Sequence, residues 1–313
     1  MDEWYRIENG EGIIPEGSTS IVDDGFCYDG EIVEDNEDLK RITLPASVKE
    51  IGSRAFTQCV SLEEIIIPEG VTRIGEYAFY GCTGLKRIYI PASVTLIENM
   101  AFTGCYSLTE IVISESNPIY DSRNNCNALI ETASNKLIYG CGSTIIPDTV
   151  TSIEDGAFHG SETLKEIEIP ASVKEIGMAA FGSCPALERI VLPESITSIE
   201  NSTFSFCESL AEINIPDSVI AIENNAFSHC RSLRSITLGD SVERIGRTAF
   251  QNCKSLTEIS LPESLTCIDG YAFEGCSSLK QVALPASLIQ IEDCAFRECT
   301  SLTEIHIPSS LIS

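Results

Sequence analysis

The sequence has few of the residues on which many kinds of site depend. Its 313 residues include three histidines, three methionines and one tryptophan. The histidines, His159, His229 and His306, occupy three different positions of the repeat described below, so the repeat does not gather them into a cluster. No His-Glu-x-x-His motif, phosphate-binding loop or nucleophile elbow occurs in the sequence. We therefore expect no catalytic residues, no metal and no cofactor.

Positive charge is also scarce. The chain has 20 Lys+Arg against 47 Asp+Glu, a formal net charge of -27, which repels phosphate backbones and anionic lipid headgroups. No apolar run approaches the eighteen or so residues that a membrane-spanning helix needs. We expect neither nucleic acid binding nor membrane insertion, and self-repulsion favours a monomer.

The first residues, MDEWYRIENGEG, contain neither the basic region nor the apolar region of a signal peptide. As written, the chain therefore indicates a cytoplasmic protein. If a signal peptide has been removed from its beginning, the cell surface or secretion is indicated instead. The sequence leaves the localisation open between these two.

What the chain does contain is a repeat of 23 residues. A Leu-Pro or Ile-Pro dipeptide marks each unit, except that Gly239 takes the place of proline in one of them. A longer unit of 33 residues at 113–145 interrupts the series, and residues 1–43 precede it as a cap with one degenerate unit. The 23-residue solenoid then occupies 44–313. The units begin at Leu44, Ile67, Ile90, Ile146, Ile169, Leu192, Ile215, Leu238, Leu261, Leu284 and Ile307.

One unit shows which structure the repeat predicts. The segment 62–67 has the alternation of a short strand, which Pro68 ends because proline cannot donate to a ladder. A second apolar segment covers 71–74. A Ser, Asn or Asp then predicts the cap of a short helical turn over Ala-Phe-x-x-Cys. One unit buries too little apolar surface to fold alone, so the units must stack. The predicted cap residues are Ser53, Asn99, Asp155, Asn201, Asn224 and Asp293.

The pattern L-x-x-I-x-I-P-x-x-V-x-x-I-G-x-x-A-F-x-x-C, present from Leu62 to Cys82, resembles the BspA-type leucine-rich repeat of bacterial surface proteins. The resemblance covers nearly the whole chain. It implies a leucine-rich repeat solenoid, mostly β with short helical turns, that forms an open right-handed coil with a continuous parallel sheet on one face. It also implies host attachment or protein–protein contact, frequent export and no catalytic residues.

Nine of the fourteen cysteines share one repeat position. Stacked coils place such a column in a line, whereas a zinc site needs four ligands that converge. Parallel side chains along a column also leave the Cβ atoms too far apart for an unstrained disulfide. We interpret these cysteines as small buried residues with a weak donor. Cys126 and Cys141 lie off the column, and a disulfide between them in an oxidising compartment stays open. The column comprises Cys59, Cys82, Cys105, Cys184, Cys207, Cys230, Cys253, Cys276 and Cys299.

The long unit predicts a hairpin, with strands at 128–131 and 136–139 joined by residues 132–135. It is a recognition projection, a hinge between two stacks, or a tolerated surface insertion. An enzyme would have its site in this irregular unit, near residues 114–145. That hypothesis predicts a pocket with perturbed pKa values near Asp121 and Tyr139.

The outward side of the strands is the candidate partner-binding face. If Ile65 and Ile67 point inward, then residues 64 and 66 point outward, as do their equivalents every 23 residues. We expect one outward column to be acidic and the next to be partly apolar near the amino-terminal end. The candidate residues are Glu64, Ile66, Arg87, Tyr89, Glu110, Val112, Glu166, Glu168, Arg189, Val191, Glu212 and Asn214.

These observations favour a noncatalytic module for a protein or glycan partner, with host attachment or surface adhesion as its biological setting. An intracellular scaffold or a structural spacer is the alternative, and an enzyme is less favoured. The last coil stops at residue 313, partway through a unit, which predicts an uncapped end where copies of the chain can associate end to end.

Overall fold

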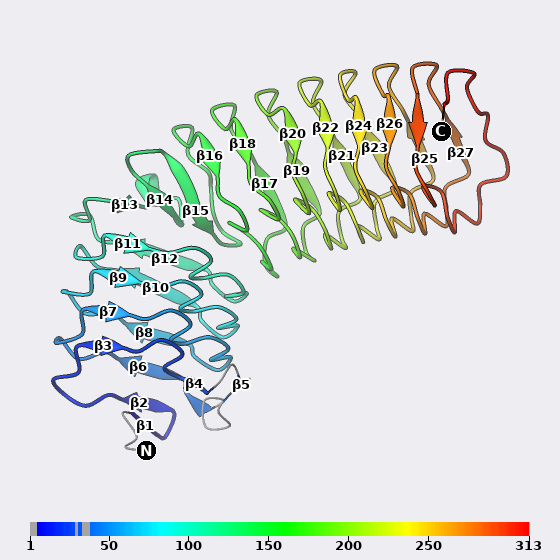
Figure 1. The fold of residues 1–313 in the computed structure, drawn as a ribbon. Helices are drawn as coiled ribbons and strands as arrows, with labels where there is room; N and C mark the ends of the chain where they lie inside the picture. The colour runs from blue at the N-terminus through cyan, green and yellow to red at the C-terminus, as the bar shows by residue number, and fades with distance from the viewer. Residues whose placement is uncertain (1–4, 29–30, 33–37, 313) are drawn as a thin grey trace. The chain divides into compact units, whose positions relative to one another are not determined.

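The structure is a computed structural model that describes residues 5–28, 31–32 and 38–312 (Figure 1). Its contacts divide the chain into two compact units, Met1–Ile145 and Ile146–Ser313. The division falls directly after the long unit of the sequence. It does not coincide with the boundary between cap and repeats at residues 43 and 44, which stays a prediction.

Each coil of the first unit contributes one strand to what we call the first strand row. In β8 (Glu64–Ile66), the middle residue Ile65 is buried and its neighbours point outward. β1 pairs with β2 antiparallel, and β2 pairs with β6 parallel. β6 with β8 and β10 with β12 also pair parallel, and their partners lie one repeat length apart. The row contains β1 (Arg6–Glu8), β2 (Glu11–Ile13), β6 (Arg41–Thr43), β8, β10 (Arg87–Ile90) and β12 (Glu110–Ile113).

The second apolar segment of each coil forms a second strand row of two-residue strands. Ile51 pairs with Ile74 in register, and both are fully buried. In the first unit this row contains β3 (Ser20–Ile21), β7 (Glu50–Ile51), β9 (Arg73–Ile74) and β11 (Leu96–Ile97). β4 (Cys27–Tyr28) and β5 (Glu31–Ile32) form a separate antiparallel pair.

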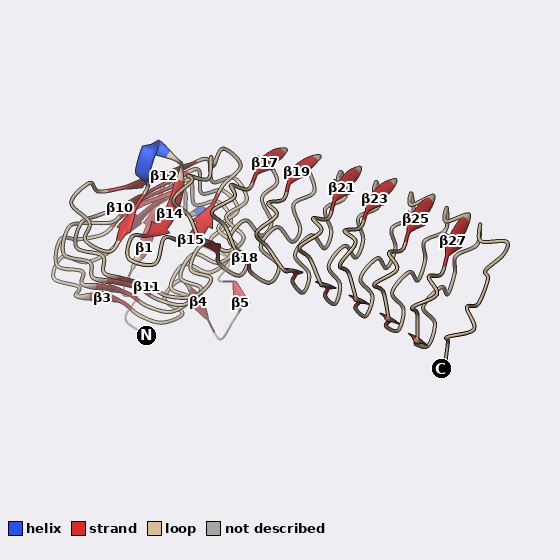
Figure 2. Ribbon diagram, turned by 90° about the horizontal axis from the view of Figure 1, so that it is seen from above, coloured by secondary structure: helices blue, strands red, loops and turns tan. Residues whose placement is uncertain are grey.

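The second unit repeats both rows (Figure 2). Its first strand row contains β17 (Glu166–Glu168), β19 (Arg189–Val191), β21 (Glu212–Asn214), β23 (Ser235–Thr237), β25 (Glu258–Ser260) and β27 (Gln281–Ala283). Its second strand row contains β16 (Ser152–Ile153), β18 (Glu175–Ile176), β20 (Ser198–Ile199), β22 (Ala221–Ile222), β24 (Arg244–Ile245), β26 (Cys267–Ile268) and β28 (Gln290–Ile291).

The solenoid with stacked parallel strands is confirmed, but the prediction of one continuous sheet is wrong. The first strand row forms the sheets β1-β2-β6-β8 and β10-β12 in the first unit, and β17-β19 and β21-β23-β25-β27 in the second. Strands of three or four residues make few ladder bonds, and the bonds beside them vary in length, up to 3.4 Å from Thr257 N–H to Arg234 O, where β23 and β25 still pair. Between β8 and β10, Lys86 N–H donates to Glu63 O at 3.3 Å, whereas Glu63 N–H donates to Lys40 O at 2.8 Å.

The predicted helical turns are also wrong, because no α-helix occurs within 5–28, 31–32 and 38–312. The Ala-Phe segment contains two left-handed residues, Arg54 (φ 56°) and Gln58 (φ 60°), which interrupt a right-handed helix. The N–H of Phe56 donates to Ala78 O of the next coil at 2.7 Å. The equivalent pairs are Tyr77 and Gly81, Met100 and Gly104, Gly156 and Gly160, Ala179 and Ser183, Ser202 and Phe206, Asn225 and His229, Thr248 and Asn252, Tyr271 and Gly275, and Cys294 and Glu298.

Two of the six predicted helix caps connect coils instead. Oδ1 of Asp155 accepts a hydrogen bond from Met178 N–H at 2.7 Å, and Oδ1 of Asn224 accepts one from Arg247 N–H at 2.8 Å. Each donor lies 23 residues after its acceptor. These side chains therefore satisfy the backbone of the next coil rather than that of their own turn.

A phenylalanine column forms the centre of each unit. Phe56 and Phe79 stack with ring centroids 5.3 Å apart and planes 4° apart. The cysteine column lies beside it, and Cys82 Sγ donates to Phe56 O at 3.0 Å. The column cysteines are free and buried, which confirms the packing interpretation. Cys126 and Cys141 are likewise free and buried, so the structure contains no disulfide between them.

The long unit contains β13 (Tyr120–Asp121), the 3-10 helix η2 (Arg123–Asn125), β14 (Ala128–Glu131) and β15 (Lys136–Gly140). β14 and β15 pair antiparallel with a register shift between Leu129 and Ile130. The hairpin expected in this segment is therefore present. Leu129, Ile130 and Leu137 are buried, and Leu129 and Tyr139 belong to the hydrophobic core that the coils of the first unit form.

Candidate functional site

All twelve candidate residues lie at outward positions of the first strand row, which we call the strand face of each unit. Ile66, Tyr89 and Val191 are 52%, 42% and 38% exposed. Six candidates lie in the first unit, on β8, β10 and β12, and six lie in the second, on β17, β19 and β21. The structure thus gives the predicted orientation, and their role in binding stays a prediction.

The strand face of the first unit is not an acidic line. Arg41 pairs in register with Glu64, and Arg87 with Glu110. The guanidinium and carboxylate groups of these pairs approach to 3.9 and 3.4 Å. With Glu11 opposite Arg41, acidic and basic side chains alternate from coil to coil. The expectation of an acidic column is therefore wrong here, because every second coil supplies an arginine.

The adjoining outward column of the first unit is apolar. Thr43 lies opposite Ile66, and Tyr89 lies opposite Val112. The coils that carry Ile66, Tyr89 and Val112 follow one another without interruption. Ile66 and Tyr89 are exposed and Val112 is half-buried. Contiguous apolar and aromatic residues that reach the surface provide anchors for a partner.

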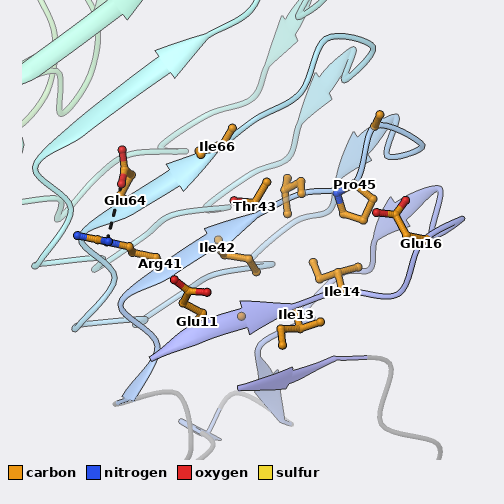
Figure 3. Close-up of a pocket in the computed structure, with 13 residues that line it drawn as sticks. Glu11, Ile13, Ile14, Glu16, Arg41, Ile42, Thr43, Pro45, Glu64 and Ile66 are labelled. Carbon is orange, nitrogen blue, oxygen red and sulfur yellow. Dashed lines mark ion pairs between the residues drawn. The ribbon is translucent and has the colours of Figure 1, made fainter. Parts of the chain in front are cut away.

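A groove of about 660 Å³ lies on this strand face. It is lined by outward residues of β2, β6 and β8, among them Glu11, Arg41 and Ile66 (Figure 3). The segments 14–16 and 44–46, which follow the strands and contain the proline dipeptides, complete it. Sequence reasoning identified Glu64 and Ile66 but missed these segments, although the recurring proline marked their position.

The second unit has a corresponding groove of about 560 Å³. Four candidates line it, Arg189, Val191, Glu212 and Asn214. Two further lining residues, Glu194 and Asp217, were not among the candidates. They directly follow the prolines at the ends of two neighbouring coils, and that shared repeat position was the signal that sequence reasoning overlooked.

The long unit is held by satisfied polar contacts. Arg123 donates to both carboxylate oxygens of Asp121, at 2.7 and 2.6 Å, and its Nη1 donates to Asn135 Oδ1 at 2.6 Å. Thr132 donates its hydroxyl to Asp121 at 2.8 Å. Burial raises the pKa of Asp121, but the bonds from Arg123 and Thr132 outweigh it, so the pKa is lowered overall.

A lowered pKa keeps Asp121 ionised and unsuited to act as a general acid. The amide of Asn127 joins the long unit to the preceding coil, where its Oδ1 accepts from Ile111 N–H at 2.7 Å. Neither groove described above contains a residue of the long unit. The geometry of this segment therefore supports a structural role better than catalysis.

The described part of the chain contains no group of three or more His, Cys, Asp or Glu residues arranged to hold a metal ion. Within that same part, no helix has the length and apolar character needed to cross a bilayer.

Comparison with family models matches the BspA type leucine rich repeat region, in six copies, to residues 33–134, 131–257 and 221–313. A search of curated proteins found no significant match.

Solved structures show the same fold. A leucine rich cell surface protein from Faecalibacterium prausnitzii is 27% identical with a TM-score of 0.56, covering 82% of this chain and 85% of its own. A leucine-rich repeat protein from Eubacterium ventriosum is 21% identical with a TM-score of 0.63, covering 98% and 94%. The pneumococcal vaccine antigen PcpA is 21% identical with a TM-score of 0.64, covering 88% and 71%.

Proposed function

Because the chain belongs to the BspA-type leucine-rich repeat family, we propose that it is a noncatalytic interaction module whose strand faces bind a protein or glycan partner. Leucine-rich repeat folds typically serve as interaction scaffolds rather than as enzymes. The observation that carries the proposal is the apolar stripe on consecutive coils, in which Ile66 and Tyr89 are exposed and Val112 is half-buried. The groove on the same face supports it, because a partner needs both anchors and a surface that fits them.

The setting we propose is attachment at a cell surface. The similarity to the leucine rich cell surface protein of Faecalibacterium prausnitzii supports this setting. Fractionation of the native cell with an antibody to this chain tests it directly. Recovery from the envelope or the medium is the expected result, and recovery from the cytosol alone would replace attachment by an intracellular scaffold.

Site-specific photocrosslinking tests the interaction module itself. We would place p-benzoylphenylalanine at Tyr89 on the strand face and, as the matched control, at Leu96. Leu96 is 45% exposed in the same unit but lies on the second strand row. Crosslinks to a partner are expected from Tyr89 and not from Leu96.

A second measurement uses the combined substitution Tyr89→Ala and Val112→Asp. It removes the aromatic anchor and places a charge in the stripe, so captured partner is expected to fall at least about tenfold. Unchanged capture would show that this face is not the contact surface. If no crosslinks form from either position, the spacer alternative replaces the interaction module.

A further inference from the structure

Four acidic residues follow one another on the second unit, and we call them the acidic row: Glu194, Asp217, Asp240 and Glu263. Each occupies the position directly after the proline, or after Gly239, in successive coils. All four are exposed. Asp217 Oδ1 accepts a hydrogen bond from Asp240 N–H at 3.0 Å, which ties neighbouring members together. None of the four forms an ion pair with Lys or Arg within the part of the chain that the structure describes.

The charge lies at one edge of the strand face. Glu168, at the end of β17, adds a further negative charge at this edge. At the opposite ends of the strands both signs of charge occur, because Arg189 begins β19 while Glu166 and Glu212 begin the strands on either side of it. The acidic row therefore creates a local negative potential rather than reflecting the net charge of the whole molecule.

The same position in the first unit is built differently. Glu69 is flanked there by Ala46 and Ala92, and its carboxylate accepts a hydrogen bond from Ala92 N–H at 3.4 Å. Alanine between the acidic residues doubles their spacing and weakens the repulsion. In the acidic row, like charges on adjacent coils destabilise the fold unless a cation lies between them. The second unit thus carries a repulsion that a positively charged partner would relieve.

The geometry matches an extended chain. Adjacent coils lie about 4.8 Å apart, so the three steps of the acidic row span about 14 Å. An extended peptide places same-face side chains about 6.7 Å apart, and three of them cover nearly the same length. The groove beside the row contributes Val191 for apolar contact and the Asn214 amide for a hydrogen bond.

We propose that the acidic row and the adjoining groove bind an extended, Lys- or Arg-rich segment of a protein partner. This proposal rests on the proposed function and names the class of partner for the second unit. Alternating cationic side chains pair with the acidic row, and the segment lies along the stack of coils. A neutral glycan does not supply the positive charge that this edge requires.

The test uses the full chain and a fluorescein-labelled peptide of about ten residues in which lysine and serine alternate. Fluorescence anisotropy measures its affinity at low ionic strength and at about 0.15 M salt. The row variant combines Glu194→Gln, Asp217→Asn, Asp240→Asn and Glu263→Gln. Asp217→Asn keeps the oxygen that accepts from Asp240 N–H, so the backbone contact is preserved.

The control variant removes the same number of negative charges at exposed residues off the strand face. It combines Glu162→Gln, Glu175→Gln, Glu243→Gln and Asp293→Asn, whose side chains are exposed. We expect the row variant to weaken peptide binding at least about tenfold and the control variant to change it less than about twofold. Equal losses in the two variants would reduce the binding to nonspecific attraction and overturn the proposal. The absence of measurable binding to the wild-type chain would overturn it as well.

A neutral oligosaccharide, cellohexaose, is the second probe. Saturable binding of cellohexaose that the row variant loses would assign the groove to a glycan and overturn the proposal. The outcomes also separate this proposal from the proposed function. If the peptide does not bind while crosslinks form from Tyr89, the proposed interaction module stands and only the Lys- or Arg-rich partner is ruled out. If both fail, neither stands.

Discussion

The strand faces of the two units differ although the same repeat builds them. In the first unit, Arg41 and Arg87 alternate with glutamates, and the ion pairs are satisfied within the face. In the second unit, the acidic row leaves carboxylates on four successive coils without cationic partners among the described residues. The inward columns are the same in both units because stacking requires them. Only the outward columns are free to diverge, so the recognition of a partner depends on them.

The cores of the two units differ at one point. In the first unit the phenylalanine stack ends against Tyr139 of the hairpin, tilted by 55° and 5.8 Å from Phe102. In the second unit the stack continues from Phe158 to Phe296 with planes within 18°. The comparison predicts that the second unit depends more strongly on each ring.

Removing one phenylalanine ring from each unit tests this difference between the cores directly. Phe227 stacks on Phe204 and Phe250 at 5.3 Å on both sides, so Phe227→Ala leaves a cavity between two rings. We expect a loss of about 3–5 kcal/mol in the free energy of unfolding. Phe102→Ala is the matched variant in the first unit and is expected at the low end of that range. Hydrogen exchange measured by mass spectrometry gives the loss of protection within each unit.

Equal losses of protection for Phe102→Ala and Phe227→Ala would remove the contrast between an interrupted and a continuous stack. A loss below about 1 kcal/mol in either variant would show that the phenylalanine column does not carry the core.

Ionisation of the buried thiols is expected to have the next largest effect on the free energy of unfolding. Burial raises the pKa of Cys230 from about 9 to about 12, and that of Cys299, near the last coil, to about 11. A raised pKa means that the folded state favours the protonated thiol. This contribution is fully present below pH 9 and is lost as the pH rises to about 12. For Cys230 the difference amounts to about 4 kcal/mol after complete ionisation.

Alkylation with iodoacetamide as the pH is raised, followed by peptide mass spectrometry, measures the reactivity of each cysteine thiol separately. We expect exposed Cys294 to react at neutral pH, Cys299 to react at a higher pH, and Cys230 to react last. Cys105 has a pKa raised by burial in the first unit, so it is expected to resist as Cys230 does. Reaction of Cys230 at neutral pH would contradict the packing role of the column.

The sequence predicted much of this architecture because a repeat shows the same pattern many times. The strand at 64–66 and the inward Phe56 and Cys59 followed from spacing alone. The helical turn was wrong because Arg54 and Gln58 adopt a left-handed conformation that side chains of their type rarely adopt. The hydrogen bonds to the next coil explain this left-handed conformation, and the sequence of a single unit does not show them.

The candidate face was predictable in orientation but not in charge pattern. The alternation of strand residues placed Glu64 outward, and the fixed repeat length set its register against Arg41. The sequence contained both arginines, yet their neutralising effect appears only when the coils are paired. The acidic row was missed because its residues lie after the strand rather than on it.

The hairpin of the first unit offers a third test. Arg123 holds Asp121 and Asn135 together, so Arg123→Ala is expected to lower the free energy of unfolding by about 1–3 kcal/mol. The lowered pKa of Asp121 stabilises the fold above pH 3.8, and that stability is lost as the pH falls through the lower folded value. Urea unfolding across the acid range measures both. Arg123→Lys is the control, because it keeps the charge without the paired contact. Equal stability of the alanine variant and the wild-type protein would contradict the role of this residue.

The smallest effect on stability comes from a substitution that gives the strand column of the first unit a run of carboxylates, at strand positions rather than at the position after the proline. Arg87 lies between Glu64 and Glu110 and pairs with Glu110 at 3.4 Å. Because the pair is exposed, Arg87→Glu is expected to lower the free energy of unfolding by no more than about 1 kcal/mol. The same substitution gives the first unit three carboxylates in succession, so the Lys-Ser peptide is expected to bind more tightly than it does to the wild-type chain. Arg87→Gln removes the cation without adding an anion and is expected to change the affinity less. If Arg87→Glu leaves peptide affinity unchanged, a run of carboxylates is not sufficient for binding, and the groove contacts at Val191 and Asn214 must supply what the charge does not.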